Sequence, residues 1–275
     1  MKNNKSLGQN WLKNRLILDD IADMASGEQS FFEGVRLGLA PRSAPEKKAL
    51  RTTPAICLEI GPGLGTLTSS LLKRFSKIIA VEFDANLAHN LPKSFPGKNL
   101  EVINQDILEF DLNQIAAPYA VAGNIPYYIT SPIIKKLLTT DNKPQKIVLL
   151  IQKEVAERIA DERETVLSLF VKNYAKIELG PIVKREEFTP PPKVDSQVII
   201  FIPYENPQFD PAIFKTIKLG FASPRKKLLA NLSLIKSRDE LKVIFAKLGI
   251  AENARPADLH LATWAALHSA LSQKL

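Results

Sequence analysis

The stretch Glu59-Ile-Gly-Pro-Gly-Leu-Gly65 holds three of the chain's 12 glycines within five positions. The apolar residues 53–60 predict a short buried strand at its start. Beyond it, residues 66–75 place leucine and phenylalanine at the spacing of one helix face. Glycine lets the backbone turn sharply and lets a ligand approach the main chain closely. The stretch therefore predicts a strand-to-helix turn that can hold a nucleotide-like ligand.

The alternation of strands and helices continues along the chain. Further short strands are predicted at residues 77–82, 99–104, 119–123 and 146–151, and a helix at 84–91. Such alternation indicates an α/β fold with a mostly parallel sheet. After residue 176, two strand-like segments have no obvious helix between them, and a hairpin-like pair is the more natural interpretation there.

Proline marks the expected domain boundary. Seven of the 19 prolines fall between Pro181 and Pro211, and residues 211–275 beyond them predict several short helices and no strand. We therefore expect a catalytic, ligand-binding domain at residues 1–205 and a small all-helical domain at 206–275. Residues 33–53 show no clear periodicity and predict a loop insertion.

Composition excludes several classes of protein. The 275 residues are 45% hydrophobic and 24% charged, which is ordinary for a globular chain. No apolar run approaches the ~18 residues of a membrane span, and the N-terminus lacks the pattern of a secretory signal. We expect a cytoplasmic chain with no membrane partner. One cysteine, Cys57, and three histidines disfavour a disulfide framework and a metal site.

The net charge of +8 favours a polyanionic partner. Residues 204–275 carry eleven basic and six acidic side chains, whereas the other 203 residues carry 26 and 23. The C-terminal part is therefore the more basic per residue. Charge alone does not separate a nucleic-acid surface from a solvated helical face.

The spacing of the glycines selects among ligands. A dinucleotide fingerprint needs glycine three positions after Gly63, where this chain has Thr66. The E-x-G-x-G-x-G pattern instead favours S-adenosylmethionine, with Gly61 and Gly63 at the cofactor. Glu82 ends the next strand, where a carboxylate can accept hydrogen bonds from both ribose hydroxyls. Asp106 follows the third strand and could accept from the adenine amine, although by itself it also fits a helix cap.

The sequence Asn124-Ile-Pro-Tyr127 follows the fourth strand and suits methylation of an exocyclic base nitrogen. The lone pair of such an amine is conjugated into the ring, so the nitrogen is a poor nucleophile. The Asn124 side-chain oxygen and the Ile125 carbonyl could accept its two hydrogens and localise the lone pair. Pro126 would hold these acceptors in place before reaction, which makes electrostatic stabilisation effective. Tyr127 could stack on the base.

Phe188 precedes three prolines and could close the other face of the base. Taken alone, a phenylalanine in this setting favours simple packing. The target base would have to be single-stranded or flipped out of a duplex.

The ordered set of motifs resembles the ribosomal RNA adenine N6,N6-dimethyltransferases of the small-subunit type, from residue 5 to about residue 258. The matching segments are Lys5-Ser-Leu-Gly-Gln-Asn-Trp-Leu12, Glu59-Ile-Gly-Pro-Gly-Leu-Gly65, Val81-Glu-Phe-Asp84, Asn104-Gln-Asp-Ile107, Asn124-Ile-Pro-Tyr-Tyr-Ile-Thr-Ser-Pro132, Gln152-Lys-Glu-Val-Ala-Glu-Arg158, Phe188-Thr-Pro-Pro-Pro-Lys-Val-Asp-Ser196 and Phe221-Ala-Ser-Pro-Arg-Lys-Lys-Leu228 with Asn231.

The resemblance implies a class I methyltransferase fold, Rossmann-like, with a seven-stranded sheet and a small helical C-terminal domain. It implies that Asn10, Leu12 and Asn124 contact the cofactor together with Gly61, Glu82 and Asp106. The implied substrate is a pair of adjacent adenines in a hairpin loop near the 3′ end of small-subunit RNA, within a partly assembled 30S-type particle. Each adenine takes two methyl groups. Arg225, Lys226 and Lys227 would face phosphates, and we expect a monomer.

Three features depart from the family pattern. Residues 33–53 are longer than the usual link, residues 159–167 lack the usual Gly-Ser-Lys segment, and Trp11 replaces phenylalanine. Two alternatives remain open on the same fold. One is a methyltransferase of large-subunit RNA, of the kind that confers macrolide resistance; the Phe188 and Phe221 segments favour the small-subunit type. The other is a non-catalytic RNA-binding assembly or transcription factor, which would not need intact cofactor residues.

Overall fold

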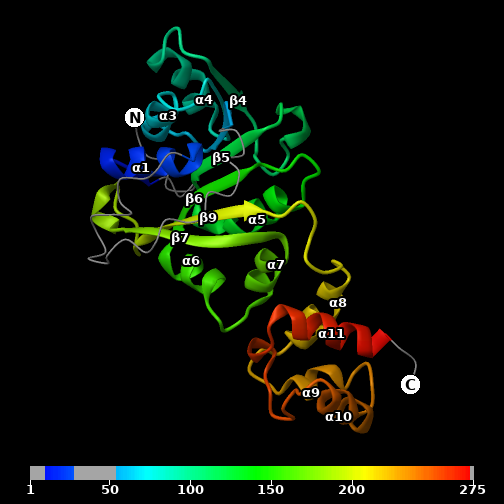
Figure 1. Cartoon of the computed structure of the whole chain (residues 1–275). Coiled ribbons are helices and arrows are strands. Elements are labelled where there is room, and N and C mark those ends of the chain that lie inside the picture. The colour runs from blue at the N-terminus through cyan, green and yellow to red at the C-terminus, as the bar shows by residue number, and fades with distance from the viewer. Residues whose placement is uncertain (1–9, 28–53, 273–275) are drawn as a thin grey trace, which may run out of the picture. The chain divides into compact units, whose positions relative to one another are not determined.

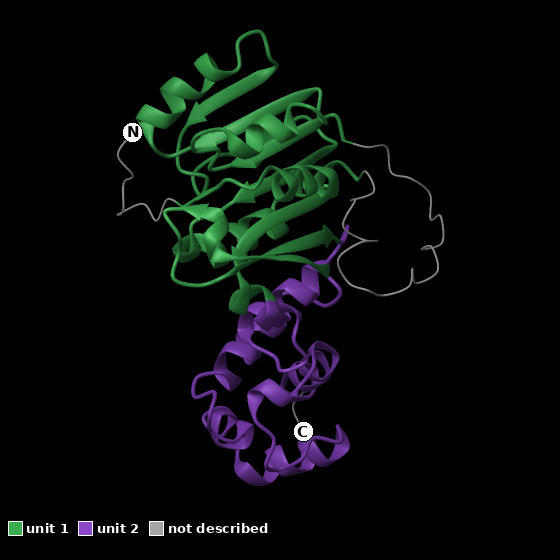
Figure 2. Cartoon of the chain, turned by 90° about the vertical axis from the view of Figure 1, so that its left-hand side faces the viewer, with its two compact units in different colours: residues 1–156, 177–203 green, residues 157–176, 204–275 purple. Residues whose placement is uncertain are grey.

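The computed structural model describes residues 10–27 and 54–272, so the predicted insertion at 33–53 and the segment from Lys5 to Gln9 lie outside the described residues. The chain forms two compact units (Figure 2). The first comprises residues 1–156 and 177–203, and the second comprises 157–176 and 204–275. The main boundary at 203/204 lies two residues from the expected one. Residues 157–176 join the second unit, although the sequence placed them in the first.

Burial explains why this segment changes unit. Its helix α7 (Val166–Tyr174) places Leu169 in an apolar core with residues of the C-terminal helices. Glu164, just before α7, donates its backbone N–H to the Ala257 carbonyl at 3.0 Å. These contacts are far apart in sequence, so composition and periodicity gave no sign of them.

A seven-stranded sheet forms the centre of the first unit, in the order β4-β3-β2-β5-β6-β9-β7 (Figure 1). The strands are β2 (Ile56–Ile60), β3 (Lys77–Glu82), β4 (Leu100–Asn104), β5 (Tyr119–Asn124), β6 (Lys146–Gln152), β7 (Ala175–Val183) and β9 (Ser196–Pro203). The first five strands in this order, β4, β3, β2, β5 and β6, pair in parallel with their neighbours, and β9 is antiparallel to β6. This arrangement confirms the predicted α/β class and the mostly parallel sheet. The two late strands are neighbours, as the hairpin-like interpretation expected.

The register of β2 aligns the ends of three strands. Ile60, its last residue, lies opposite Val81 of β3 and Gly123 of β5. The residues that follow are therefore brought to one edge of the sheet. These are the glycine turn, Glu82 and Asn124.

Helices connect the strands of the first unit. They are α1 (Arg15–Ser26), α3 (Thr66–Leu71), α4 (Ala85–Asn90), α5 (Thr130–Thr139) and α6 (Lys153–Ala160), with the short 3-10 turns η2 (Leu91–Ser94), η3 (Leu112–Gln114), η4 (Tyr127–Ile129) and η5 (Arg185–Glu187). α1 packs on α3, β5 and β6. Ile17, Ile21 and Leu71 are buried in this apolar cluster. Asn14 caps α1, because its side chain accepts from the backbone N–H groups of Leu16 and Ile17.

A two-stranded antiparallel pair joins the N-terminal segment to the proline-rich segment. β1 (Trp11–Leu12) pairs with β8 (Phe188–Thr189), and Leu12 lies opposite Phe188. The two side chains are 0% and 1% exposed. The pair therefore anchors Asn10 and Trp11 beside the edge of the sheet that carries the glycine turn.

The second unit also contains α8 (Ile213–Gly220), α9 (Leu228–Leu232), α10 (Arg238–Lys247), the 3-10 turn η6 (Pro256–Asp258) and α11 (Leu261–Ser272). As predicted, the described residues beyond 211 form helices and no strand. Trp264 and Phe245 are fully buried in their core. None of the helices in the described ranges is long and apolar enough to cross a membrane.

Candidate functional site

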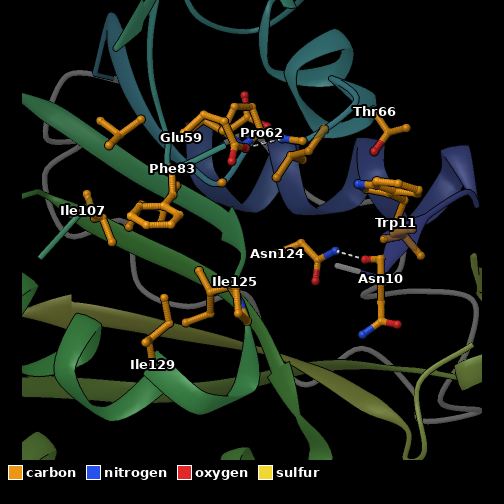
Figure 3. A pocket seen from close by; sticks show the side chains of 18 of the residues that line it. Asn10, Trp11, Glu59, Pro62, Thr66, Phe83, Ile107, Asn124, Ile125 and Ile129 are labelled. Carbon is orange, nitrogen blue, oxygen red and sulfur yellow. Dashed lines mark hydrogen bonds between the residues drawn. The ribbon is translucent and has the colours of Figure 1, made fainter. Parts of the chain in front are cut away.

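A cavity of about 180 Å³ lies at the carboxyl ends of β2, β3 and β5 (Figure 3). Its walls hold ten of the eleven residues that the sequence predicted for the cofactor and the target base. They are Asn10, Leu12, Gly61, Gly63, Glu82, Asp106, Asn124, Ile125, Pro126 and Tyr127.

The glycine turn forms one wall of the cavity. Gly61, Gly63 and Gly65 have φ angles of +65°, +57° and +83°, which L side chains rarely adopt. A Cβ atom on Gly63 would lie 3.0 Å from the Trp11 Nε1 atom. Glycine is therefore required both for the turn and for the close approach of the indole.

Glu82 fastens the glycine turn to β3. Its Oε2 atom accepts from the Gly63 N–H at 3.0 Å, and its Oε1 atom accepts from the Asp84 N–H at 2.9 Å. The side chain is 6% exposed, and burial raises its pKa, although these backbone donors oppose the rise. Each oxygen has a second lone pair, so the carboxylate can still accept from ligand hydroxyls.

The position of Asp106 is compatible with both roles considered from the sequence, a cap and an acceptor for the cofactor adenine. Its Oδ1 atom accepts from the Leu108 N–H at 2.8 Å, as a cap does. The residue also lines the cavity. Capping fixes the orientation of the carboxylate and leaves acceptor capacity for a ligand amine.

Glu59 is a site residue that the sequence argument did not single out. It lines the cavity, is 1% exposed, and neither carboxyl oxygen has a hydrogen bond within the described part of the chain. Burial raises the pKa of the Glu59 carboxyl to about 8. The neighbouring carboxyl of Glu82 contributes to this higher pKa, and Thr68 lowers it. A buried carboxylate without a partner favours a cationic ligand. The first position of the E-x-G-x-G-x-G pattern was the available sign.

The charges of the residues that line the cavity discriminate between candidate cofactors. Glu59, Glu82 and Asp106 line the cavity, and no lysine or arginine of the described residues does. S-adenosylmethionine carries a sulfonium, an ammonium and a carboxylate group, hence a net positive charge, and no phosphate, so it fits an acidic cavity. The pyrophosphate of a dinucleotide would meet three carboxyl groups and no cationic side chain.

The side chain of Asn124 is fixed in one orientation. Its Nδ2 atom donates to the backbone carbonyl of Asn10 at 2.9 Å (Figure 3). Because a carbonyl can only accept, the Asn124 Oδ1 atom remains as a preset acceptor. The contact also explains how a residue 114 positions upstream takes part in the site.

Tyr127 is held in place by a residue far along the chain. Its hydroxyl forms a 2.8 Å hydrogen bond with the Ser196 hydroxyl at the start of β9. Burial raises the pKa of the phenol, so it is neutral at physiological pH. This hydrogen bond fixes the position of the ring beside Asn124.

Phe188 is not brought into the cavity. Its side chain is 1% exposed, belongs to the apolar core and does not line the cavity wall. The β1–β8 pairing turns it inward against Leu12. In this structure the side chain packs in the apolar core, and its expected role at the second face of the base stays a prediction. Phe83 and Tyr128, which line the cavity and are 62% and 65% exposed, supply the exposed aromatic rings there.

Arg225, Lys226 and Lys227 lie in the second unit, between α8 and α9, and all three are exposed. Asn231 holds the turn before them, because its Nδ2 atom donates to the carbonyls of Gly220 and Ser223. The three cations are thus presented on a fixed segment that is separate from the cofactor cavity.

The seven-stranded sheet and the acidic cavity define a class I S-adenosylmethionine-dependent methyltransferase. The family model described as "Ribosomal RNA adenine dimethylase" matches residues 1–273. The chain belongs to this family, whose enzymes dimethylate adenines of ribosomal RNA.

Curated relatives and solved structures agree with this assignment. A Synechocystis protein named "Ribosomal RNA small subunit methyltransferase A" is 35% identical over 97% of this chain and 95% of its own length. A Fusobacterium nucleatum protein of the same name is 38% identical over 74% and 81%. A dimethyladenosine transferase from Plasmodium falciparum has a TM-score of 0.72 at 26% identity, covering 93% and 95%. The 23S rRNA methyltransferase ErmE has a TM-score of 0.70 at 26% identity, covering 96% and 100%.

The protonation state of Glu59 leads to a testable prediction about cofactor binding. At pH 7 a carboxyl with a pKa of about 8 is mostly protonated, and a bound cation lowers that pKa. Binding of S-adenosylmethionine should therefore release up to one proton, and affinity should rise toward pH 8 by at most about tenfold per pH unit. Calorimetry in buffers of different ionisation enthalpy measures the released proton.

The isosteric substitution Glu59→Gln is the control, because it keeps the size of the side chain and removes the titrating group. It should abolish the proton release and flatten the pH dependence. Equal proton release by the wild type and the variant would show that another group titrates.

Proposed function

We propose that this enzyme dimethylates the N6 amines of two adjacent adenosines in a hairpin loop near the 3′ end of small-subunit rRNA. The proposal rests on the preset acceptor of Asn124 beside an acidic cofactor cavity, and on curated relatives named for the small subunit. We propose a monomer that acts in the cytoplasm on a partly assembled 30S-type particle.

In the proposed reaction, Asn124 and the Ile125 carbonyl accept the two hydrogens of the target amine. This removes conjugation with the ring and localises the lone pair on N6. Pro126 restricts the conformation of the backbone between these acceptors and Tyr127, so the acceptors need little reorganisation during methyl transfer. The bound cofactor supplies an electrophilic methyl group on a sulfonium.

Aromatic rings hold the target base in this proposal. Tyr127 lines the cavity next to Asn124 and stacks on the adenine. Methyl transfer would break the carbon–sulfur bond of the sulfonium and form the bond to N6. The positive charge that reaches N6 is lost when its proton passes to water, so no strong general base is required. Glu82 and Asp106 hold the ribose and adenine of the cofactor, Asn10 and Leu12 contact it, and Gly61 and Gly63 let it approach the backbone.

We propose that Arg225, Lys226 and Lys227 contact RNA phosphates. Their exposure and the hydrogen bonds of Asn231 to the preceding turn support this role. Phosphate contacts position an RNA without reading its sequence. The 206–275 region is accordingly the RNA-binding domain of the proposal, and residues 1–205 are the catalytic domain.

The alternative substrate is large-subunit rRNA. The similarity to ErmE, named a 23S rRNA methyltransferase, favours it. The curated relatives named for the small subunit are more similar, at 35% and 38% identity against 26%. The segments around Phe188 and Phe221 also favour the small subunit.

The purified enzyme should transfer tritiated methyl groups to unmethylated small subunits. Mass spectrometry of the nucleosides should then detect N6,N6-dimethyladenosine, and large subunits treated in parallel serve as the control. Product on the large subunit alone would select the alternative substrate.

Asn124→Ala should lower kcat by about 10²- to 10³-fold, because it removes the preset acceptor from the transition state. Calorimetry should show a much smaller effect on cofactor affinity. Asn113→Ala, which truncates an exposed asparagine outside the cavity, is the matched control. An equal loss of transfer and of cofactor affinity would mean that Asn124 acts mainly as a cofactor ligand.

Replacement of Arg225, Lys226 and Lys227 by glutamine should weaken RNA binding and flatten its dependence on salt, because fewer counterions are released. Fluorescence anisotropy of labelled RNA at several KCl concentrations measures both effects. Cofactor affinity should not change, because these residues do not line the cavity. An unchanged salt slope would place the RNA surface elsewhere.

A further inference from the structure

A second cavity, of about 240 Å³, adjoins the cofactor cavity in the first unit. The two cavities share Leu18 and Thr66 in their walls. The remaining walls of the second cavity are Lys13, Arg15, Leu64, Gly65, Ser69, Ser70, Lys73 and Phe95. Neither the motifs nor the proposed cofactor contacts account for it.

The two neighbouring cavities have opposite charge. Among the residues that the structure describes, the second is lined by Lys13, Arg15 and Lys73 and by no acidic residue, whereas the cofactor cavity is lined by three acidic residues and no basic one. A group that is stable in one cavity is therefore repelled from the other. The second cavity fits an anion; the only anionic group of S-adenosylmethionine is its carboxylate, and the cofactor carries no phosphate.

The cations of this cavity are largely available to a ligand. Lys13 and Arg15 are exposed, and neither forms an ion pair with a carboxylate in the described ranges. Lys73 lies 3.5 Å from Asp19, whose carboxylate also accepts from Arg74 at 3.2 Å. The pairing with Asp19 is shared with Arg74, so it neutralises Lys73 only in part.

The cavity is built from fixed elements. Thr66, Ser69, Ser70 and Lys73 follow one another at helical spacing, so they share one face of α3 and of the turn that follows it at residues 72–74. The Lys13 backbone N–H donates to the Glu187 carbonyl at 2.9 Å. Asn14 caps α1 and donates its Nδ2 atom to Glu187 Oε2 at 3.0 Å. The backbone of the two cations is thus held in place before any ligand arrives.

We propose that this cavity binds a backbone phosphate of the RNA strand next to the target nucleotide. The inference rests on the proposed RNA substrate, since the strand must pass the mouth of the cofactor cavity to present a base to Asn124. Lys13 and Arg15 contact the phosphate oxygens, and the hydroxyl of Ser69 donates a further hydrogen bond. Such a contact fixes the register of the strand without reading its sequence.

Charge removal tests the cavity directly. Lys13→Gln and Arg15→Gln should each weaken RNA binding and reduce the slope of log Kd against log salt, and the double variant should reduce it by about 0.7, the value for one phosphate contact on a single strand. Lys98→Gln is the matched control, because Lys98 is exposed in the same unit and lines neither cavity. Anisotropy of labelled RNA across KCl concentrations gives the slope.

Ser69 provides a second test that keeps every cation. Ser69→Asp places a negative charge inside the cavity and should raise the Kd for RNA at least tenfold, whereas Ser69→Ala should change it less than threefold. Calorimetric cofactor affinity and the thermal transition should match the wild type in both variants, which shows that the fold is kept. The KM for RNA should rise more than kcat falls.

Two outcomes overturn the inference: salt slopes for Lys13→Gln and Arg15→Gln equal to that of Lys98→Gln, or equal RNA affinity for Ser69→Asp and Ser69→Ala. The test uses whichever rRNA the wild type methylates. Failure of the small-subunit proposal is read from the wild-type methylation product alone, so the two failures are distinguishable.

Discussion

The parallel register of β2 with β3 and β5 is the constraint on which the site depends. Because Ile60 lies opposite Val81 and Gly123, the segments that follow three separate strands emerge at one edge of the sheet. Glu82 then reaches the Gly63 N–H, and Asn124 reaches the Asn10 carbonyl. A shift of one residue in any of these pairings would move the side chains to the other face.

Charge is separated over short distances in this basic chain. The cofactor cavity concentrates three acidic residues, although the chain as a whole carries +8. Glu59 is kept there without a hydrogen-bond partner in the described residues, which is costly for a buried carboxyl. Protonation lowers that cost in the free enzyme, and a cationic ligand offsets it in the complex. The basic cavity next door provides the opposite environment within the same unit.

Contacts distant in sequence complete the site. The β1–β8 pair brings residues 11 and 12 to the proline-rich segment, and Tyr127 bonds to Ser196 at the start of β9. These contacts explain why the proline-rich segment matters even though Phe188 is buried. It acts as a support for the N-terminal strand, and the exposed rings at the cavity are Phe83 and Tyr128.

The sequence by itself determined the class of fold, the glycine turn, and the positions of Glu82, Asp106 and Asn124, because each follows from local periodicity and spacing around one motif. It placed Asn10 and Leu12 only through resemblance, since nothing local signals a two-residue strand that pairs with residues 176 and 178 positions away. Tertiary structure alone decided the burial of Phe188, the transfer of residues 157–176 to the second unit, the unpaired state of Glu59 and the basic cavity. These depend on which side chains from distant segments meet and on how much water is excluded between them, and hydrophobic periodicity carries no information on either.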